Sequence, residues 1–529
     1  MNILVRRRLH RFLGVATTGL VLATATACVS DATPSPSSTN VATDPNATVH
    51  IAWAGPPTNL DPQLQVSPAD MPYTVLLYDR LTRMSADGNS VEPMLATSWT
   101  FSSDGKSLEL KLRTDVTFHD GTPFNSAAVK ANLERGKNLQ GSTVSGDLAS
   151  ITSIDTPDAS TVVLGLNGGG AALPVAFTTN TGEMISPKAI ADGRDLRLGP
   201  GDAGSGAYTL TELKPGESAN FQRSESYWDG RQRAKALEIT VANSASAING
   251  LIAGQFDLVQ VTTGADTQRT LDGANQGQYI AYVADVRGSH TLMLNSTKAP
   301  LDNLKVRQAI SLAIDRDSIG NQLYEGQCVP SYQPFGPGNP AYNPSVDADY
   351  KYNLDKAKQL LAESGVANPT VEIEYGPAHQ VTAEAVQAQL VKAGINAQLK
   401  PVPQADVSPN FNGGESMATI TGIVVGADAS TFMSRYVIGG ANWSRGGDPT
   451  LVDEVKTLSS EALNPALSTA DRGAKYQQVQ KIIADQAWAV QVCSAKQIWA
   501  HSAKVVGVDE TFPGAWAGLP EFDRLAMAL

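Results

Sequence analysis

The stretch Leu292–Asp317, LMLNSTKAPLDNLKVRQAISLAIDRD, decides the fold class of this chain. The apolar run that ends at Asn295 predicts a strand, and a loop with Pro300 leads to a helix whose start Asp302 can cap. Apolar side chains then recur at the spacing of one buried helical stripe: Val306, Ala309, Ile310, Ala313 and Ile314. The opposite side of the helix is expected to carry Arg307, Gln308, Asp315 and Arg316. A strand followed by such a helix indicates an α/β domain.

Length and charge limit the classes of function. A chain of 529 residues is too long for one hydrophobic core, so two or three domains are expected. Its composition, 42% hydrophobic and 17% charged, is typical of a globular protein. The net charge of −12 argues against nucleic acid as a partner, and equally against electrostatic adhesion to anionic lipid.

The N-terminus reads as a targeting segment. Four arginines up to Arg11 precede the uncharged run Phe12–Ala27, which is shorter than the ~20 residues that span a bilayer. Residues 1–27 are therefore predicted to be a signal peptide. The run ends in Ala25-Thr-Ala-Cys28, which resembles a bacterial lipobox and makes Cys28 the candidate lipidated residue; the alternative is a soluble secreted protein. Residues 28–47, rich in Ser, Thr, Pro and Asn, are expected to form a flexible tether.

Two cysteines remain beyond the tether, Cys328 and Cys493. An exported chain with two such residues suits one disulfide, and the alternative is two unpaired buried thiols.

Several motifs occur along the chain in a recognisable order. They are EPMLATSW at 92–99, FHDGTPF at 118–124, GSGAY at 204–208, YWDG at 227–230, INGLIAGQFD at 248–257 and VRQAISLAIDRD at 306–317. In this wording and order the chain resembles the extracellular solute-binding proteins of ABC importers, in the dipeptide/oligopeptide/nickel group. Gln255 departs from the pattern, because an acidic residue is usual there.

The resemblance implies an α/β, bilobal type II periplasmic-binding-protein fold with an extra inserted domain. The expected divisions are residues 48–85, 196–289 and 488–529 for lobe I, 86–195 for the inserted domain II, and 290–487 for lobe III. It also implies a monomeric receptor, held at the outer face of the cell membrane by its lipid. Such a receptor closes about a hinge over a peptide and presents it to an ABC permease and ATPase.

Ligand-binding residues are inferred from the same resemblance. Asp428, in the stretch TGIVVGADAS at 421–430, is expected to pair with a peptide's ammonium group, and the alternative is a helix cap. Asn442, Trp443 and Arg445 resemble a loop that lines the ligand cleft, where Trp443 would stack and Arg445 would bind a carboxylate. Tyr73 and Arg287 are added because they stand beside strand ends that face the cleft.

No catalytic motif, metal cluster or cofactor motif stands out in the sequence, so no catalytic residue, metal or cofactor is predicted. His119 is interpreted as a turn residue, and the G-x-G-x-x-G match at 199–204 as accidental because a strand follows it. The leading hypothesis is a peptide receptor without catalysis. Receptors for an oligosaccharide or another small solute, a secreted hydrolase, and an adhesin or signalling protein are the alternatives.

Overall fold

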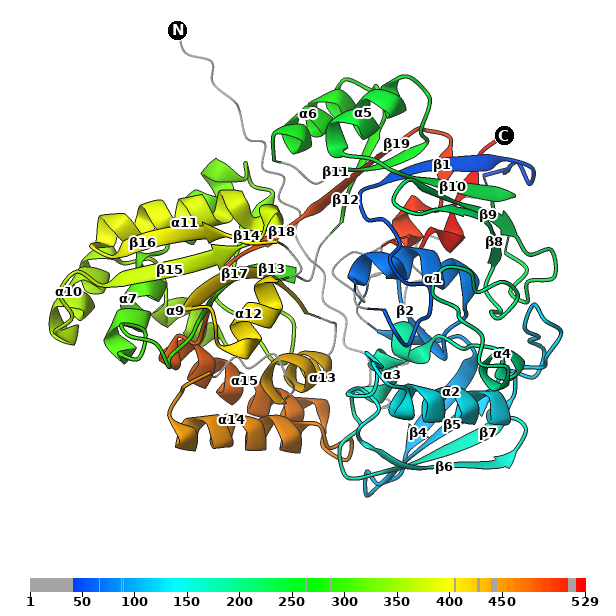
Figure 1. Cartoon of the computed structure of the whole chain (residues 1–529), viewed down its shortest axis with the longest axis horizontal. Coiled ribbons are helices and arrows are strands. Elements are labelled where there is room, and N and C mark those ends of the chain that lie inside the picture. Colours follow the sequence, from blue (N-terminus) through cyan, green and yellow to red (C-terminus); the bar gives the residue numbers. More distant parts are fainter. Residues whose placement is uncertain are drawn as a thin grey trace, which may run out of the picture. The chain divides into compact units, whose positions relative to one another are not determined.

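The computed structural model describes residues 41–529 apart from 66, 87, 89, 232, 262–263, 285–287, 404–405, 426–428, 439–444 and 512–519. Residues 42–529 form one compact unit. Within this unit, three sheets of four or more strands are each accompanied by helices (Figure 1). Two strand pairs, β2 (Thr82–Met84) with β3 (Val91–Pro93) and β20 (Val505–Val506) with β21 (Ala526–Met527), complete the sheet structure described.

The first sheet has seven strands in the order β12-β19-β11-β1-β10-β9-β8. Strand β1 lies at its centre, parallel to both β10 and β11. Its strands come from distant parts of the sequence: β1 Thr48–Trp53, β8 Tyr208–Lys214, β9 Ser218–Arg223, β10 Ala236–Val241, β11 Leu258–Val261, β12 Ile280–Ala284 and β19 Gln497–His501. Its helices are α1 (Met71–Leu77), α5 (Ser244–Ile252) and α6 (Gly264–Asn275). Alternation along β1 buries Val49 and Ile51 in the core.

The second sheet has six strands in the order β14-β18-β13-β17-β15-β16. Helices α7, α10 and α11 contribute to one hydrophobic cluster with it, and Figure 1 draws α11 beside β16. The strands are β13 Gly288–Leu294, β14 Cys328–Pro330, β15 Thr370–Tyr375, β16 Asn396–Pro401, β17 Ala418–Val424 and β18 Ala489–Ala495. The helices on this side of the molecule are α7 Leu304–Ala313, α8 Arg316–Ser318, α9 Pro344–Asp349, α10 Leu354–Ser364, α11 Gln380–Ala393, α12 Val407–Gly413, α13 Ala429–Phe432, α14 Pro449–Ala462 and α15 Thr469–Gln486.

The third sheet is antiparallel, in the order β4-β5-β7-β6, and packs against helix α2. Its elements are β4 Ala96–Phe101, β5 Ser107–Leu112, α2 Ser126–Asn138, β6 Ile151–Asp158 and β7 Thr161–Leu166, followed by α3 Leu173–Ala176 and α4 Pro187–Ala191. Leu108, Leu110 and Leu112 are buried, as their alternation predicts. Asn125 caps α2 by accepting a hydrogen bond from the Ala128 amide at 3.1 Å.

Two crossings of the chain join the first sheet to the second. One runs from β12 to β13, and the other from β18 to β19, where only Lys496 separates the strands (Figure 1). The predicted boundary at residue 488 is wrong, because β18 pairs with β13 and β14 of the second sheet. The second crossing therefore lies at Lys496.

The apolar stripe predicted for helix α7 is confirmed, whereas the cap of the helix and the environment of its arginines differ from expectation. All five stripe residues are buried. The cap is Asn303 instead of Asp302, because the Asn303 side chain accepts from the Lys305 amide at 3.0 Å. Arg307 and Arg316, which were expected on the side opposite the stripe, are buried as well. Their guanidinium groups donate to main-chain oxygens, Arg307 to Gln486 at 2.8 Å and Arg316 to Gln491 at 2.7 Å. Burial lowers the pKa of each to about 10.

Covalent and terminal contacts tie the unit together. Cys328 and Cys493 form a disulfide between β14 and β18, across 165 residues of sequence. The first described residues pair with the last ones: the Asp44 amide donates to the Met527 oxygen at 2.8 Å, and the Leu529 amide to the Ala42 oxygen at 3.0 Å.

Candidate functional site

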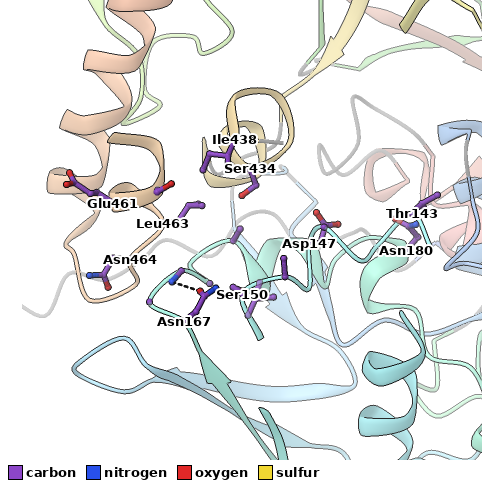
Figure 2. Close-up of a pocket in the computed structure, with 18 of the residues that line it drawn as sticks. Thr143, Asp147, Ser150, Asn167, Asn180, Ser434, Ile438, Glu461, Leu463 and Asn464 are labelled. Carbon is purple, nitrogen blue, oxygen red and sulfur yellow. Dashed lines mark hydrogen bonds between the residues drawn. The ribbon is translucent and has the colours of Figure 1, made fainter. Parts of the chain in front are cut away.

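A cavity of about 970 Å³ lies between the loops of the third sheet and the helical segment that connects β17 and β18 of the second sheet (Figure 2). One wall comes from residues before the first crossing: Gln65, Ser67, Met71, Thr143, Gly146, Asp147, Ala149, Ser150, Asn167–Gly170, Ala172, Leu173 and Asn180. The other comes from the π-helical turn η5 (Met433–Ile438) and the end of α14: Ser434, Ile438, Ser460, Glu461, Leu463 and Asn464. The walls touch where the Ala171 amide donates to the Leu463 oxygen at 3.1 Å.

A glycine loop after β7 shapes the floor of the cavity. Gly168 and Gly170 have φ of 97° and 132°, a region that favours glycine. A Cβ at Gly170 would also lie 2.9 Å from the Leu166 side chain. Asn167 closes the turn, because its Oδ1 accepts from the Gly169 amide at 3.2 Å. This leaves the Nδ2 group of Asn167 as its donor toward the cavity.

The side chain of Gln65 is held in place by a hydrogen-bond chain that ends at the buried carboxyl group of Glu183. Its Nε2 donates to Thr74 Oγ1 at 2.8 Å, and Thr74 Oγ1 donates to Glu183 Oε1 at 3.0 Å. Burial raises the pKa of Glu183 to about 8, although Arg80 opposes the shift. Glu183 is therefore protonated at neutral pH. Because Gln65 Nε2 is engaged by Thr74, Gln65 has its Oε1 left as an acceptor toward the cavity.

The remaining amides are fixed by main-chain partners. Asn180 Nδ2 donates to the Pro62 oxygen at 2.8 Å, so its Oδ1 remains as an acceptor. Asn464 Oδ1 accepts from the Ala466 amide at 2.9 Å, so its Nδ2 remains as a donor. The amide groups of the lining thus have defined roles.

Charge in the cavity is negative. Asp147 accepts from the Thr181 hydroxyl at 2.7 Å, and Glu461 pairs with Lys475, which lies outside the lining, at 2.7 Å. Among the lining residues that the structure describes, none is Lys, Arg or His.

Most of the predicted ligand-binding residues cannot be placed. Asp428, Asn442, Trp443 and Arg287 lie outside the described residues. Arg445 is half-buried, and its Nη1 donates to the Asn412 oxygen at 3.1 Å. Arg445 is not among the lining residues of the cavity.

The prediction for Tyr73 needs correction. Its side chain is fully buried in the core of the first sheet, and its hydroxyl donates to the Gly55 oxygen at 2.9 Å. Burial also raises its pKa above the usual value. Tyr73 is thus a core residue with a satisfied hydroxyl, and we remove it from the ligand-binding candidates.

Sequence reasoning missed the polar residues of the cavity. Gln65, Asp147, Asn167 and Asn180 lie in connections, where no periodic pattern marks a facing side chain. The only available signal was the run Gly168-Gly-Gly170 directly after an alternating strand.

The described part of the chain shows neither a metal-ion cluster nor a membrane-spanning helix. No group of three or more His, Cys, Asp and Glu there is arranged to hold a metal ion. No described helix combines the length and hydropathy that a membrane span requires. The ring of His119 contacts the Gly206 oxygen through Nε2 at 3.0 Å, in keeping with its interpretation as a turn residue.

Comparisons with known proteins give the wider context. A sequence model of the family described as "Bacterial extracellular solute-binding proteins, family 5 Middle" matches residues 90–444, more than half of the chain. Heme-binding protein A of Haemophilus influenzae is 27% identical over 526 residues, covering 91% of this chain and 93% of that protein. The probable D,D-dipeptide-binding periplasmic protein of Escherichia coli K12 is 26% identical, covering 83% of this chain and 86% of that protein.

Solved structures share the fold. NikA of Brucella suis, in complex with Fe(III)-EDTA, superposes with a TM-score of 0.79 at 24% identity, over 91% of this chain and 100% of that one. DppA of Helicobacter pylori, in complex with the peptide STSA, gives 0.77 at 22% identity, over 92% and 98%. The predicted bilobal α/β fold of the type II periplasmic binding proteins is confirmed by this likeness.

Proposed function

The chain belongs to the bacterial extracellular solute-binding proteins of family 5, and from this membership we propose that it is the substrate-binding component of an ABC importer. It captures di- or oligopeptides, closes over them, and delivers them unchanged to a membrane permease with its ATPase.

One observation carries the proposal. The cavity takes its walls from both sides of the two chain crossings, residues 65–180 on one side and 434–464 on the other. A solute held there contacts both walls only while they are close together. Its binding free energy therefore favours the closed arrangement, with the β12–β13 and β18–β19 connections as the hinge.

Anchoring is part of the proposal. Acylation of Cys28 and a tether that ends before Ala42, instead of at the predicted residue 47, would hold the receptor at the outer face of the membrane as a monomer. Support comes from the pairing of Ala42 and Asp44 with the C-terminal residues Leu529 and Met527. This pairing fixes the point where the tether joins the folded unit.

A second candidate ligand is an oligosaccharide or another small polar solute. The lining supports it, because amides and hydroxyls such as those of Asn167, Asn180 and Ser434 can bind sugar hydroxyl groups. No described side chain of the lining is aromatic.

A ligand screen tests the proposal. The mature protein should be mixed separately with peptides, oligosaccharides and Ni²⁺, followed by calorimetric melting and small-angle scattering. The true ligand should raise the melting temperature in proportion to RT ln(1 + [L]/Kd) and reduce the radius of gyration. Chromatography should return it chemically intact.

Two results would contradict the proposal. Conversion of the ligand to a product would indicate an enzyme. If no solute changes the melting temperature or the radius of gyration, the protein has no transported ligand and belongs to another class, such as the adhesins.

A further inference from the structure

We propose that His290 and His379 form a proton-sensitive contact at the base of the hinge, through which acidification opens the walls of the cavity. This histidine pair lies outside the lining of the cavity. The inference rests on the proposed function for the hinge at the β12–β13 and β18–β19 connections. It adds a means of release, because a solute captured near neutral pH is set free in acidic surroundings.

His290 lies close to both crossings of the chain. It is the third residue of β13, the strand that follows the first crossing. Its neighbours across the second sheet are Gly422 of β17 and Cys493 of β18. Cys493 stands three residues before Lys496, where the second crossing lies. Strand β17 is followed in the sequence by α13 and η5, and η5 supplies part of one cavity wall. A change at His290 therefore acts where both crossings and one wall begin.

The two imidazole rings meet in an arrangement that suits their neutral forms. Their centroids lie 4.8 Å apart, with an angle of 78° between the ring planes. Nδ1 of His290 lies 2.6 Å from the Thr382 hydroxyl, which in turn lies 2.7 Å from the Tyr324 hydroxyl. Nδ1 of His379 is buried and has no hydrogen-bond partner among the residues that the structure describes. A proton added there would have no acceptor to bind.

The surroundings of the pair offer no counter-charge. The titratable side chains on the elements around it are Tyr324 and the exposed Glu325 before β14, Tyr375 at the end of β15, and the exposed Glu384 on α11. The Glu384 carboxylate accepts from Gln380 at 2.9 Å. Burial lowers the pKa of both histidine rings, that of His379 to about 4, and His379 lowers the pKa of His290 further.

Acidification therefore acts on the contact in one direction. A ring released into water regains its usual pKa near 6.5 and binds a proton below that pH, which the packed ring does not. Falling pH favours the released state, whereas the contact is intact above pH 6.5. For His379 alone, the population of the released state should rise about 25-fold between pH 7.5 and pH 5.0.

Release of His379 reaches the wall through β17. The ring belongs to the short helical turn η4 (Pro377–His379) and lies against Gly422, where a Cβ would be 3.4 Å from its Cε1 atom. When the ring moves out, β17 loses this packing on the side that leads to α13 and η5. The wall that η5 supplies is then free to move away from the third sheet.

The experiment measures amide hydrogen exchange on the solute-free mature protein at pH 7.5 and pH 5.0, corrected for the intrinsic pH dependence of exchange. Two amides report on the contact and on the walls. The His379 amide donates to the Gly376 oxygen at 2.9 Å, and the Ala171 amide joins the walls through the Leu463 oxygen at 3.1 Å. At the lower pH we expect protection to fall about 25-fold at His379 and at least 10-fold at Ala171. The Leu166 amide, bonded within the third sheet, should keep its protection.

Two substitutions change the proton response in defined ways. His379→Phe keeps an aromatic ring against His290 and removes the titration, so most of the pH effect at both amides should disappear. Gly422→Asp places a carboxylate beside the His379 ring, so that a protonated ring has a partner and acid no longer opens the walls. Gly422→Asn has the same size without the charge and should respond as the wild type does. His50→Gln, at a side chain 45% exposed on the first sheet, is the control for loss of a histidine elsewhere.

The outcomes separate the inference from the proposed function. A His379 ring that titrates near pH 6.5 in nuclear magnetic resonance spectra, or a His379→Phe variant with the wild-type response, overturns the inference. So does loss of protection at position 379 alone, because the contact would then be acid-labile without moving the walls. An Ala171 amide that is unprotected at every pH overturns it as well, since the walls would not meet without a solute. Capture of a solute stands in each of these cases, because the ligand screen decides it independently.

Discussion

At the scale of single residues, Glu183 makes the clearest prediction about pH. The side chain is fully buried, and burial raises its pKa to about 8 from 4.5. Between these two values the folded state holds a proton that the unfolded state has lost, so stability falls as pH rises through this window. Glu183→Gln removes the titration and should stabilise the protein at pH 8.5 by up to roughly 4 kcal/mol. Near pH 4.5 the two proteins should melt alike.

Calorimetric melting between pH 4.5 and 9 measures this effect. Glu109→Gln is the matched control, because Glu109 lies on β5 with 45% of its side chain exposed beside Lys111. It should leave the pH dependence as in the wild type. Parallel stability curves for wild type and Glu183→Gln would show that Glu183 is ionised in the fold.

At the scale of elements, the hairpin between β4 and β5 contacts the cavity wall. Gly105 in this hairpin has φ of 68°, and a Cβ there would lie 2.7 Å from Asn464 Oδ1. Gly105→Ala should therefore cost about 1 kcal/mol in backbone strain and also displace Asn464, a lining residue. We expect several-fold weaker solute binding, measured by titration calorimetry.

Gly121→Ala is the control that separates the effect of backbone strain from the effect of contact with Asn464. Gly121 has φ of 83°, but a Cβ there meets nothing within 4 Å. Its variant should lose similar stability and keep the wild-type affinity. Equal affinities for the two variants would show that the hairpin does not position the wall.

Elements with a regular pattern could be predicted from the sequence, whereas the cavity could not. The stripe of α7, the alternation in β5 and the stop of α10 at Gly365, with φ of 71°, all follow from local rules. The burial of Arg307 and Arg316 does not, because it depends in part on the carbonyl groups of Gln486 and Gln491, which lie more than 170 positions away in the sequence. The facing of Asp147 and Asn464 is likewise set by tertiary contact between distant loops.

At the scale of the whole molecule, the first and second sheets are joined by two crossings of the chain. In the closure proposed above, the walls of the cavity separate or approach about the β12–β13 and β18–β19 crossings. Closure should therefore change hydrogen exchange at contacts that join the two walls and leave it unchanged at contacts within one wall.

The hydrogen bond from the Ala171 amide to the Leu463 oxygen, 3.1 Å long, is such a joining contact. Because it forms only while the walls meet, saturating ligand should slow hydrogen exchange at the Ala171 amide by at least 10-fold. The Leu166 amide donates to the Lys106 oxygen at 2.8 Å within the third sheet, so its exchange should not change. Amide-resolved exchange with and without ligand compares the two amides directly.

Equal slowing at both amides would indicate general stabilisation by the ligand. No slowing at Ala171 would indicate that the walls stay together when the cavity is empty. Either result would exclude closure around the solute as the means of capture.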